Sequence, residues 1–296
     1  MSAKQSAPAE PARGILRLSG ADRASFLQGL VSNDVRKIAS DRAIWAALLT
    51  AQGKYLHDFF VADLDYAWLI EDEESRIADL QRRLSLYKLR AKIAIENVGA
   101  DWEVWQGWGD GAAAAFDLAE AGQARALDGG LVFVDPRLAE LGIRLVAPRG
   151  TAQAILTAHG FAPGDPAEWD RLRLGHGVPE GSRDLVLEKS ILLESGFDEL
   201  NGIAWDKGCY IGQELTARTK YRGLIKKRLM PVDLVGALPD PGTLILRDQA
   251  EAGEIRSGRD GIALALLRLD ALDGSVLKAG ETEVRPRRPD WLSLPS

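Results

Sequence analysis

The single cysteine of the chain lies in a dense octapeptide whose residue types suit thiol chemistry. Residues 207–214 read Lys-Gly-Cys-Tyr-Ile-Gly-Gln-Glu, with Cys209 after one glycine and Lys207 two positions before it. We expect a helix to begin near Cys209 and to run to about Thr219, so that the helix dipole and the Lys207 ammonium both favour the thiolate. Cys209 would then be a nucleophile, a redox-sensitive thiol or one ligand of a shared cluster. A lone cysteine is as often a small buried apolar residue, and both interpretations stay open.

Two polar residues follow the cysteine on the same expected helix. The amide of Gln213 and the carboxylate of Glu214 suit a heterocycle with N–H and C=O edges, such as a pterin. The alternative is an exposed helix face on which Glu214 pairs with Arg218, a contact worth a few tenths of a kcal/mol. The basic stretch 220–228 could bind a polyanion, although a solvated linker is the simpler interpretation.

Metal chemistry by this chain alone is not predicted. The three histidines are scattered, and with one cysteine they do not form a set at metal-ligand spacing. Cys209 could supply only one ligand to a cluster, so the remaining ligands would come from elsewhere. The histidines are His57, His159 and His176.

Length and composition limit the class of protein. A chain of 296 residues suits two or three domains, and a net charge of −6 argues against direct nucleic-acid binding. No apolar run approaches the roughly 18 residues of a membrane span, so we expect no membrane association. One cysteine is typical of a reducing compartment, which predicts a cytoplasmic protein. The polar, Pro/Ala-rich residues 1–13 are expected to form a disordered tail.

The elements that must position the octapeptide are predicted from periodicity. Strands are expected at 14–19, 43–50 and 55–63 and helices at 72–87, 151–159 and 167–176, whereas 180–205 reads as a long ordered loop. From Leu229 onward, short strands alternate with Pro/Gly/Asp turns, a pattern typical of a small β-barrel. The fold class is therefore α+β with a C-terminal barrel.

The octapeptide closely resembles the signature of the YgfZ family, folate-binding relatives of the glycine-cleavage T-protein that include a mitochondrial branch used in iron–sulfur cluster assembly. Three further segments agree with the family in order, and the resemblance spans about residues 14–292. They are the block from Gly20 to Asp34, the turn Leu49-Thr50-Ala51-Gln52-Gly53-Lys54, and Gly177-Val178-Pro179.

The resemblance implies a T-protein-like cloverleaf of three domains around a central tetrahydrofolate cavity. We expect an α+β folate-binding domain from 14–50 plus 150–222, an inserted domain at 51–149, and the barrel at 223–296. The resemblance matches the family's folate-stacking tryptophan to Trp169, and the candidate folate site also includes Gln213, Glu214, Tyr210 and Asn33.

The same comparison separates the chain from T-proteins, whose methylene transfer relies on carboxylates. The adjacent aspartates of T-proteins match His57-Asp58 here, their pterin-binding glutamate matches Gly175, and an acid stands where this chain has Cys209. The leading hypothesis is a tetrahydrofolate-binding accessory protein for assembly or repair of iron–sulfur enzymes, including tRNA-modifying ones. In it Cys209 acts as thiolate ligand or redox handle, Lys207 lowers its pKa, and a transient cluster is shared with assembly proteins. The alternatives are a folate-dependent aminomethyltransferase and a folate-binding module without chemistry.

Overall fold

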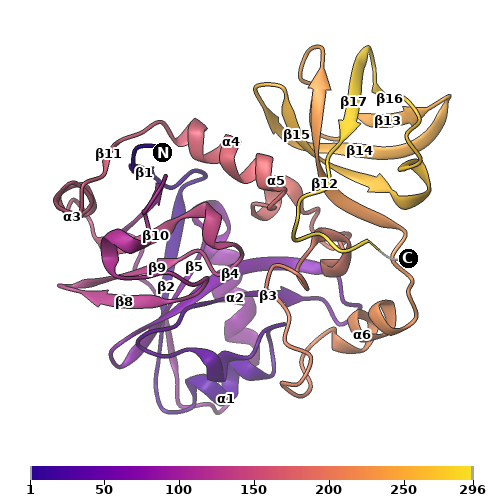
Figure 1. Cartoon of the computed structure of the whole chain (residues 1–296). Coiled ribbons are helices and arrows are strands. Elements are labelled where there is room, and N and C mark those ends of the chain that lie inside the picture. Colours follow the sequence, from indigo (N-terminus) through magenta and orange to yellow (C-terminus); the bar gives the residue numbers. More distant parts are fainter. Residues whose placement is uncertain (1, 295–296) are drawn as a thin grey trace. The chain divides into compact units, whose positions relative to one another are not determined.

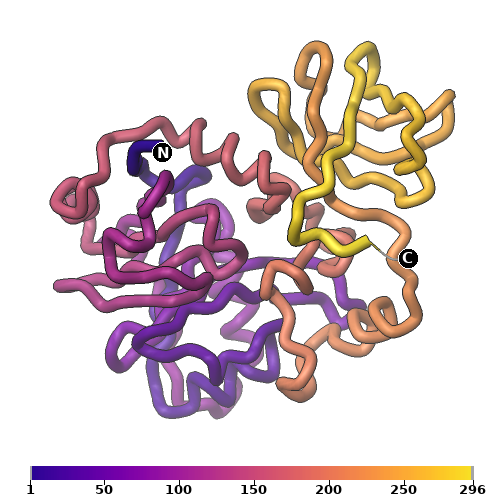
Figure 2. The backbone as a smooth tube through the Cα atoms, in the orientation of Figure 1, coloured from indigo at the N-terminus to yellow at the C-terminus, as the bar shows by residue number. Residues whose placement is uncertain are grey.

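The computed structural model describes residues 2–294, and its backbone can be followed in Figure 2. The chain divides into two units. Unit 1 comprises the residues up to Leu48, His57–Trp169 and Asn201–Ile211. Unit 2 comprises Leu49–Leu56, Asp170–Leu200 and the residues from Gly212 onward.

Unit 1 is built on two sheets (Figure 1). One has the strand order β3-β4-β5-β2-β6 and the other has the order β11-β1-β7-β10-β9-β8. In chain order the elements are β1 (Gln5–Pro8), β2 (Arg13–Ser19), α1 (Arg23–Gln28), η1 (Val35–Lys37), β3 (Ile44–Leu49), β4 (Tyr55–Leu64), β5 (Ala67–Glu73), η2 (Glu74–Arg76), α2 (Ile77–Lys88), β6 (Ala94–Asn97), β7 (Trp102–Trp108), η3 (Ala114–Phe116), β8 (Ala124–Leu127), β9 (Gly130–Val134), η4 (Ala139–Leu141), β10 (Ile143–Pro148), α3 (Ala152–Ala158) and β11 (Ala162–Pro163).

The residue patterns explain why these elements form. Every residue of β3 is buried, as its unbroken apolar sequence IWAALL predicts. Helix α2 buries Ile77, Leu80 and Leu84 at helical spacing. Between the two sheets, the buried carboxylate of Glu71 accepts hydrogen bonds from Arg13 of β2 and Arg144 of β10, so that charge is paired where the sheets meet.

Unit 2 contains a closed barrel of order β12-β15-β14-β13-β16-β17 (Figure 1), which confirms the predicted C-terminal barrel. Helix α4 (Pro166–His176) crosses the boundary between the units. The other elements are α5 (Gly181–Asp184), η5 (Leu192–Ser195), α6 (Gln213–Tyr221), β12 (Lys227–Val235), β13 (Leu244–Arg247), β14 (Ala250–Arg259), β15 (Ile262–Arg268), η6 (Leu269–Ala271), β16 (Leu277–Ala279) and β17 (Thr282–Pro286).

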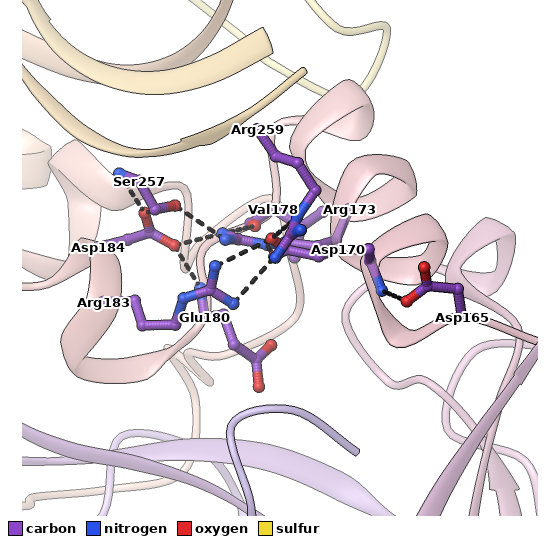
Figure 3. A network of polar contacts seen from close by, with 10 residues as sticks. Asp165, Asp170, Arg173, Val178, Glu180, Arg183, Asp184, Ser257 and Arg259 are labelled. Atoms are coloured by element: carbon purple, nitrogen blue, oxygen red, sulfur yellow. Dashed lines mark hydrogen bonds and ion pairs between the residues drawn. The ribbon is translucent and has the colours of Figure 1, made fainter. Parts of the chain in front are cut away.

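A buried network of charges joins the end of α4 to the barrel within unit 2 (Figure 3). Asp170 accepts from Arg173 at 2.8 Å, from Arg183 at 2.9 Å and from Arg259 at 3.0 Å. Arg173 also donates to Asp184. Although burial favours the protonated carboxyl, Arg173 and Arg183 hold the pKa of Asp170 well below its usual range. The network fastens α4 and α5 to the barrel strand β14.

One prediction of organisation is wrong, and the structure shows where a second falls in the fold. Residues 5–8, expected within a disordered tail, form β1, which pairs with β7 and β11 and buries Ser6 and Ala7. The four-residue strand is too short, and its Pro/Ala-rich sequence too polar, for a clear period-2 pattern to mark it. The expected domain boundary at 50/51 falls inside the β3–β4 hairpin, whose strands share one sheet.

Within residues 2–294, no helix combines the length and apolar character needed to cross a membrane.

Candidate functional site

The segment that carries the octapeptide is fastened to residues 28–33 of unit 1. Asn33 is 5% exposed and donates from Nδ2 to the carbonyls of Trp45 at 2.8 Å and Asn201 at 2.7 Å. Its Oδ1 accepts from the backbone N–H of the next residue at 2.8 Å. Asn33 was predicted to bind folate; here both ends of its amide make internal hydrogen bonds, and the one to Asn201 O contacts residues 201–211.

Lys207 holds this segment in place through hydrogen bonds from its ammonium. Its ammonium donates to the carbonyl oxygens of Gln28 at 2.7 Å, Val31 at 2.5 Å and Asn33 at 2.8 Å, and the residue is 5% exposed. Burial lowers the pKa of Lys207 to about 8, while the Asp34 carboxylate opposes that shift. A lysine that serves three carbonyls has its donors committed. Its contacts are those of a positioning residue, whereas we predicted a residue that activates the thiol.

Cys209 is exposed in a short loop between two anchors. Lys207 is the first anchor, and the second is the backbone N–H of Ile211, which donates to Gly29 O at 3.3 Å. Gly208 has a φ of +90°, a conformation that a residue with a side chain rarely adopts. Tyr210 is 7% exposed, and its ring centroid lies 5.0 Å from the Lys207 Nζ. The loop therefore presents the thiol to solvent from a backbone fixed at both ends.

The expected helix start at Cys209 is wrong. Helix α6 begins at Gln213, four residues later, and its N-cap Gly212 has a φ of +82°. A β-carbon on Gly212 would lie 2.6 Å from Thr50 O, so glycine is required where α6 approaches the tip of the β3–β4 hairpin. The left-handed glycines at 208 and 212 prevent a helix from extending through the cysteine, so the helix-dipole argument for a thiolate fails.

The predicted folate residues do not gather on one surface of unit 1. Gln213 and Glu214 lie in the first turn of α6 in unit 2, where Glu214 is exposed. Trp169 is 1% exposed and donates from its indole N–H to Leu141 O at 3.2 Å. Stacking needs an accessible ring face. Trp169 and Asn33 are thus buried and hydrogen-bonded within the chain here, and their role as folate contacts stays a prediction.

The positions that correspond to the T-protein aspartates are also occupied by internal contacts. His57 is fully buried, with Nδ1 2.8 Å from an Asp72 oxygen and Nε2 3.1 Å from an Asp79 oxygen. Asp58 accepts from the indole N–H of Trp45 at 3.0 Å. Among the residues that the structure describes, no cluster of His, Cys, Asp or Glu could hold a metal ion.

Sequence comparison identifies relatives over nearly the whole chain. The chain is 34% identical to the human protein named iron–sulfur cluster assembly factor IBA57, mitochondrial, over 94% of its own length and 83% of that protein. It is 33% identical to the mouse protein of the same name over the same shares. The chain belongs to the IBA57 family. A Mycosarcoma maydis IBA57 homologue is 29% identical over 95% of this chain and 83% of its own length.

The comparison with solved structures concerns the fold alone. The crystal structure of the glycine cleavage system aminomethyltransferase T from Bartonella henselae matches 98% of this chain and 87% of its own, with a TM-score of 0.79 at 12% identity. Residues 226–294 match the family model for the CAF17 C-terminal β-barrel domain. The predicted α+β, T-protein-like fold is confirmed.

The IBA57 relatives refine the predicted family and correct the predicted location. They bear the name IBA57, whereas the resemblance was drawn to the related YgfZ family. The predicted cytoplasmic location is wrong by this comparison, because these relatives are named mitochondrial. A single cysteine excludes a disulfide framework but does not distinguish between compartments that keep thiols reduced.

Sequence reasoning missed the part of the site formed by residues 28–33. The block FLQGLVSND was noticed as a resemblance, but nothing in it shows that its carbonyls bind Lys207, 174 to 179 positions away. The one available signal was that Gln28 and Lys207 both lie in the segments that carry the resemblance.

Proposed function

We propose that the chain acts in the assembly or repair of iron–sulfur clusters, and that Cys209 supplies one thiolate to a cluster shared with a partner protein. The observation that carries this proposal is the exposed thiol on a loop anchored at Lys207 and Ile211. The family membership supports the process, since the human and mouse relatives are named for it.

To ligate a shared cluster, the chain needs only to hold the Cys209 thiol in an accessible position. A thiolate, not a thiol, binds iron, so ligation releases the proton of Cys209 to solvent. A loop already ordered at both ends loses little conformational entropy when its thiol is ligated. One cysteine gives one ligand, so the other thiolates come from the partner. Lys207 contributes by holding the loop.

The test is complementation of a strain that lacks the gene. Clients would include enzymes that methylthiolate tRNA, whose activity is assayed under oxidative stress together with a second cluster enzyme. We expect the wild type to restore activity and Cys209→Ala to restore little, while Val276→Ala, an exposed site on the barrel (61%), restores it fully. Full rescue by Cys209→Ala would refute the ligand role.

We also propose tetrahydrofolate, or a derivative of it, as a ligand. The T-protein-like fold and the polar first turn of α6, with Gln213 and Glu214, support this part. Glu214 is exposed and Gln213 half-buried in this turn, whereas Trp169 and Asn33 are buried, so we assign the main binding contribution to Gln213 and Glu214.

A titration with tetrahydrofolate tests the ligand separately from the thiol. Loss of a hydrogen bond to the pterin costs about 1 kcal/mol, so Gln213→Ala should weaken binding roughly 5–10-fold. Cys209→Ala should bind as the wild type does. Absence of saturable binding by the wild type, or unchanged affinity in the Gln213→Ala and Glu214→Ala variants, would refute this part.

A further inference from the structure

The end of helix α2 and the residues that follow it form an apolar and basic surface in unit 1. We call it the α2 patch. Its members are Leu86, Tyr87, Lys88, Leu89, Arg90 and Lys92.

The fold does not explain the apolar residues of the α2 patch. Leu86 is 65% exposed, Tyr87 is 45% exposed and Leu89 is 89% exposed. Tyr87 continues the spacing of the buried residues of α2 but does not join the core. Leu89 has a φ of +42°, a left-handed conformation that costs a branched residue of order 1–3 kcal/mol. A leucine that is both strained and exposed contributes little to the stability of the fold. The presence of an apolar side chain at this position is therefore better explained by binding than by folding.

Among residues 2–294, the cations of the α2 patch likewise lack ion-pair partners. Residues 80–95 contain five cationic residues and no acidic ones, although the whole chain carries −6. Arg82 and Arg83 pair with Asp79 at the start of α2. Within residues 2–294, the side chains of Lys88, Arg90 and Lys92 have no ion-pair partner. Three free cations beside three exposed apolar side chains are complementary to an acidic surface that surrounds an apolar groove.

A further aromatic residue lies at the same end of the five-stranded sheet. Ala67 and Ala94 both pair with Ser19, so the turn before Ala67 and the segment before Ala94 meet there. Tyr66, in that turn, is 74% exposed. The apolar surface beside Lys92 is therefore wider than α2 alone.

Helix α1 connects the α2 patch to the Cys209 loop. Asp22, immediately before α1, accepts a hydrogen bond from the backbone N–H of Lys92 at 2.7 Å. Gly29, immediately after α1, accepts from the backbone N–H of Ile211. With a helical rise of 1.5 Å per residue, the seven steps from Asp22 to Gly29 span roughly 10 Å. A single protein partner can therefore cover the patch and reach the thiol.

We propose that the α2 patch docks the partner protein that shares a cluster with Cys209, and that this partner presents cysteine thiolates beside an acidic surface with an apolar groove. This inference rests on the proposed function of Cys209. A protein partner is preferred to an anionic membrane because the shared cluster needs thiolates from its second holder. A bilayer supplies negative charge and apolar depth but no thiolate.

Photocrosslinking in cells tests whether one partner contacts both places. A photoreactive phenylalanine analogue is placed at Leu89, at the exposed Asp206 beside the cysteine loop, or at the control site Leu244, which is 50% exposed on the barrel. We expect the same acidic, cysteine-containing protein to be captured from Leu89 and Asp206 and not from Leu244. Capture of different proteins from Leu89 and Asp206, or no excess at Leu89 over Leu244, would overturn the proposal.

Binding of the captured protein, purified and cluster-loaded, is then measured against full-length variants. Lys88→Glu with Arg90→Glu should weaken binding at least tenfold and flatten its salt dependence, whereas Lys189→Glu with Lys278→Glu, two exposed lysines of unit 2, should not. Equal effects of the two pairs would overturn the proposal. The same variants are tested on anionic phosphatidylglycerol vesicles. If the patch pair of substitutions abolishes vesicle binding but leaves partner binding intact, and the control pair changes neither, the patch is a membrane-binding surface instead.

The outcome is separable from the proposed function. If Cys209→Ala rescues the deletion strain fully while the patch variant fails to bind the partner, the ligand role falls and the docking surface stands. If Cys209→Ala fails to rescue and the patch variant binds normally, the docking surface falls alone.

Discussion

Replacement of Lys207 with methionine distinguishes a residue that holds the cysteine loop from one that activates the thiol. Methionine keeps the length and apolar stem of lysine but donates no hydrogen bond. The change leaves the carbonyls of Gln28, Val31 and Asn33 without the donor that lies 2.5–2.8 Å from them.

The expected cost follows from those contacts. A hydrogen bond from a charged donor contributes about 1.5–3 kcal/mol, and three of them are removed together. The desolvation of the buried ammonium is recovered at the same time, so the net loss is about 3–5 kcal/mol. That is a large fraction of the roughly 5–15 kcal/mol that stabilises a domain.

Urea unfolding and hydrogen exchange measure this loss. The midpoint should fall by about 1–2.5 M urea for a slope near 2–3 kcal/mol/M, and exchange protection should drop in residues 28–33 and 201–211. Lys226→Met, at an exposed lysine of the linker before β12, is the matched control and should shift the midpoint by less than about 0.2 M. Alkylation of Cys209 is followed in the same samples.

The opposite result would be equally clear. If Lys207→Met unfolds with the midpoint of the wild type while alkylation of Cys209 slows several-fold, Lys207 activates the thiol and the positioning role assigned to it is refuted.

Three further predictions concern the same contacts and the charge network of unit 2. Because burial lowers the pKa of Lys207 to about 8 from 10.5, the folded state binds fewer protons than the unfolded state between those values. The unfolding free energy of the wild type relative to Lys207→Met should therefore rise with pH across that window, by up to roughly 1.4 kcal/mol per pH unit, and a falling difference would contradict the assignment. Gly212→Ala should lose about 2–3 kcal/mol in thermal or urea unfolding, because a β-carbon there meets Thr50 O at 2.6 Å with φ at +82°, while Gly223→Ala has open space around it and should lose less. Asp170→Asn should lose about 3–5 kcal/mol, because it removes the carboxylate that Arg183 and Arg259 pair with and leaves Arg173 with Asp184 alone. Asp260→Asn, at an exposed contact 3.9 Å from Arg171, should change stability by no more than about 0.5 kcal/mol, and similar losses for the two variants would refute the role of the buried network.

The sequence by itself determined the local elements and the fold class. Apolar runs such as β3 and the helical spacing of Ile77, Leu80 and Leu84 gave elements whose burial the structure reproduces. The turn-rich C-terminal pattern predicted the barrel, which is closed. These features depend on residues within a few positions of one another, where periodicity carries the information. The octapeptide likewise singled out Cys209 without any tertiary contact.

Only the tertiary structure decided what the neighbours of Cys209 do. Lys207 lies two positions from the thiol in sequence, yet its ammonium serves carbonyls 174 to 179 positions away. Trp169 has the size and flatness for stacking on a ligand, but the surrounding fold covers it. The exposure of Leu89, and the lack of an ion-pair partner for the nearby cations in the part of the chain that the structure describes, cannot be read from periodicity either. A side chain's available bonds depend on which distant backbone groups the fold brings to it, and those groups leave no trace in local spacing.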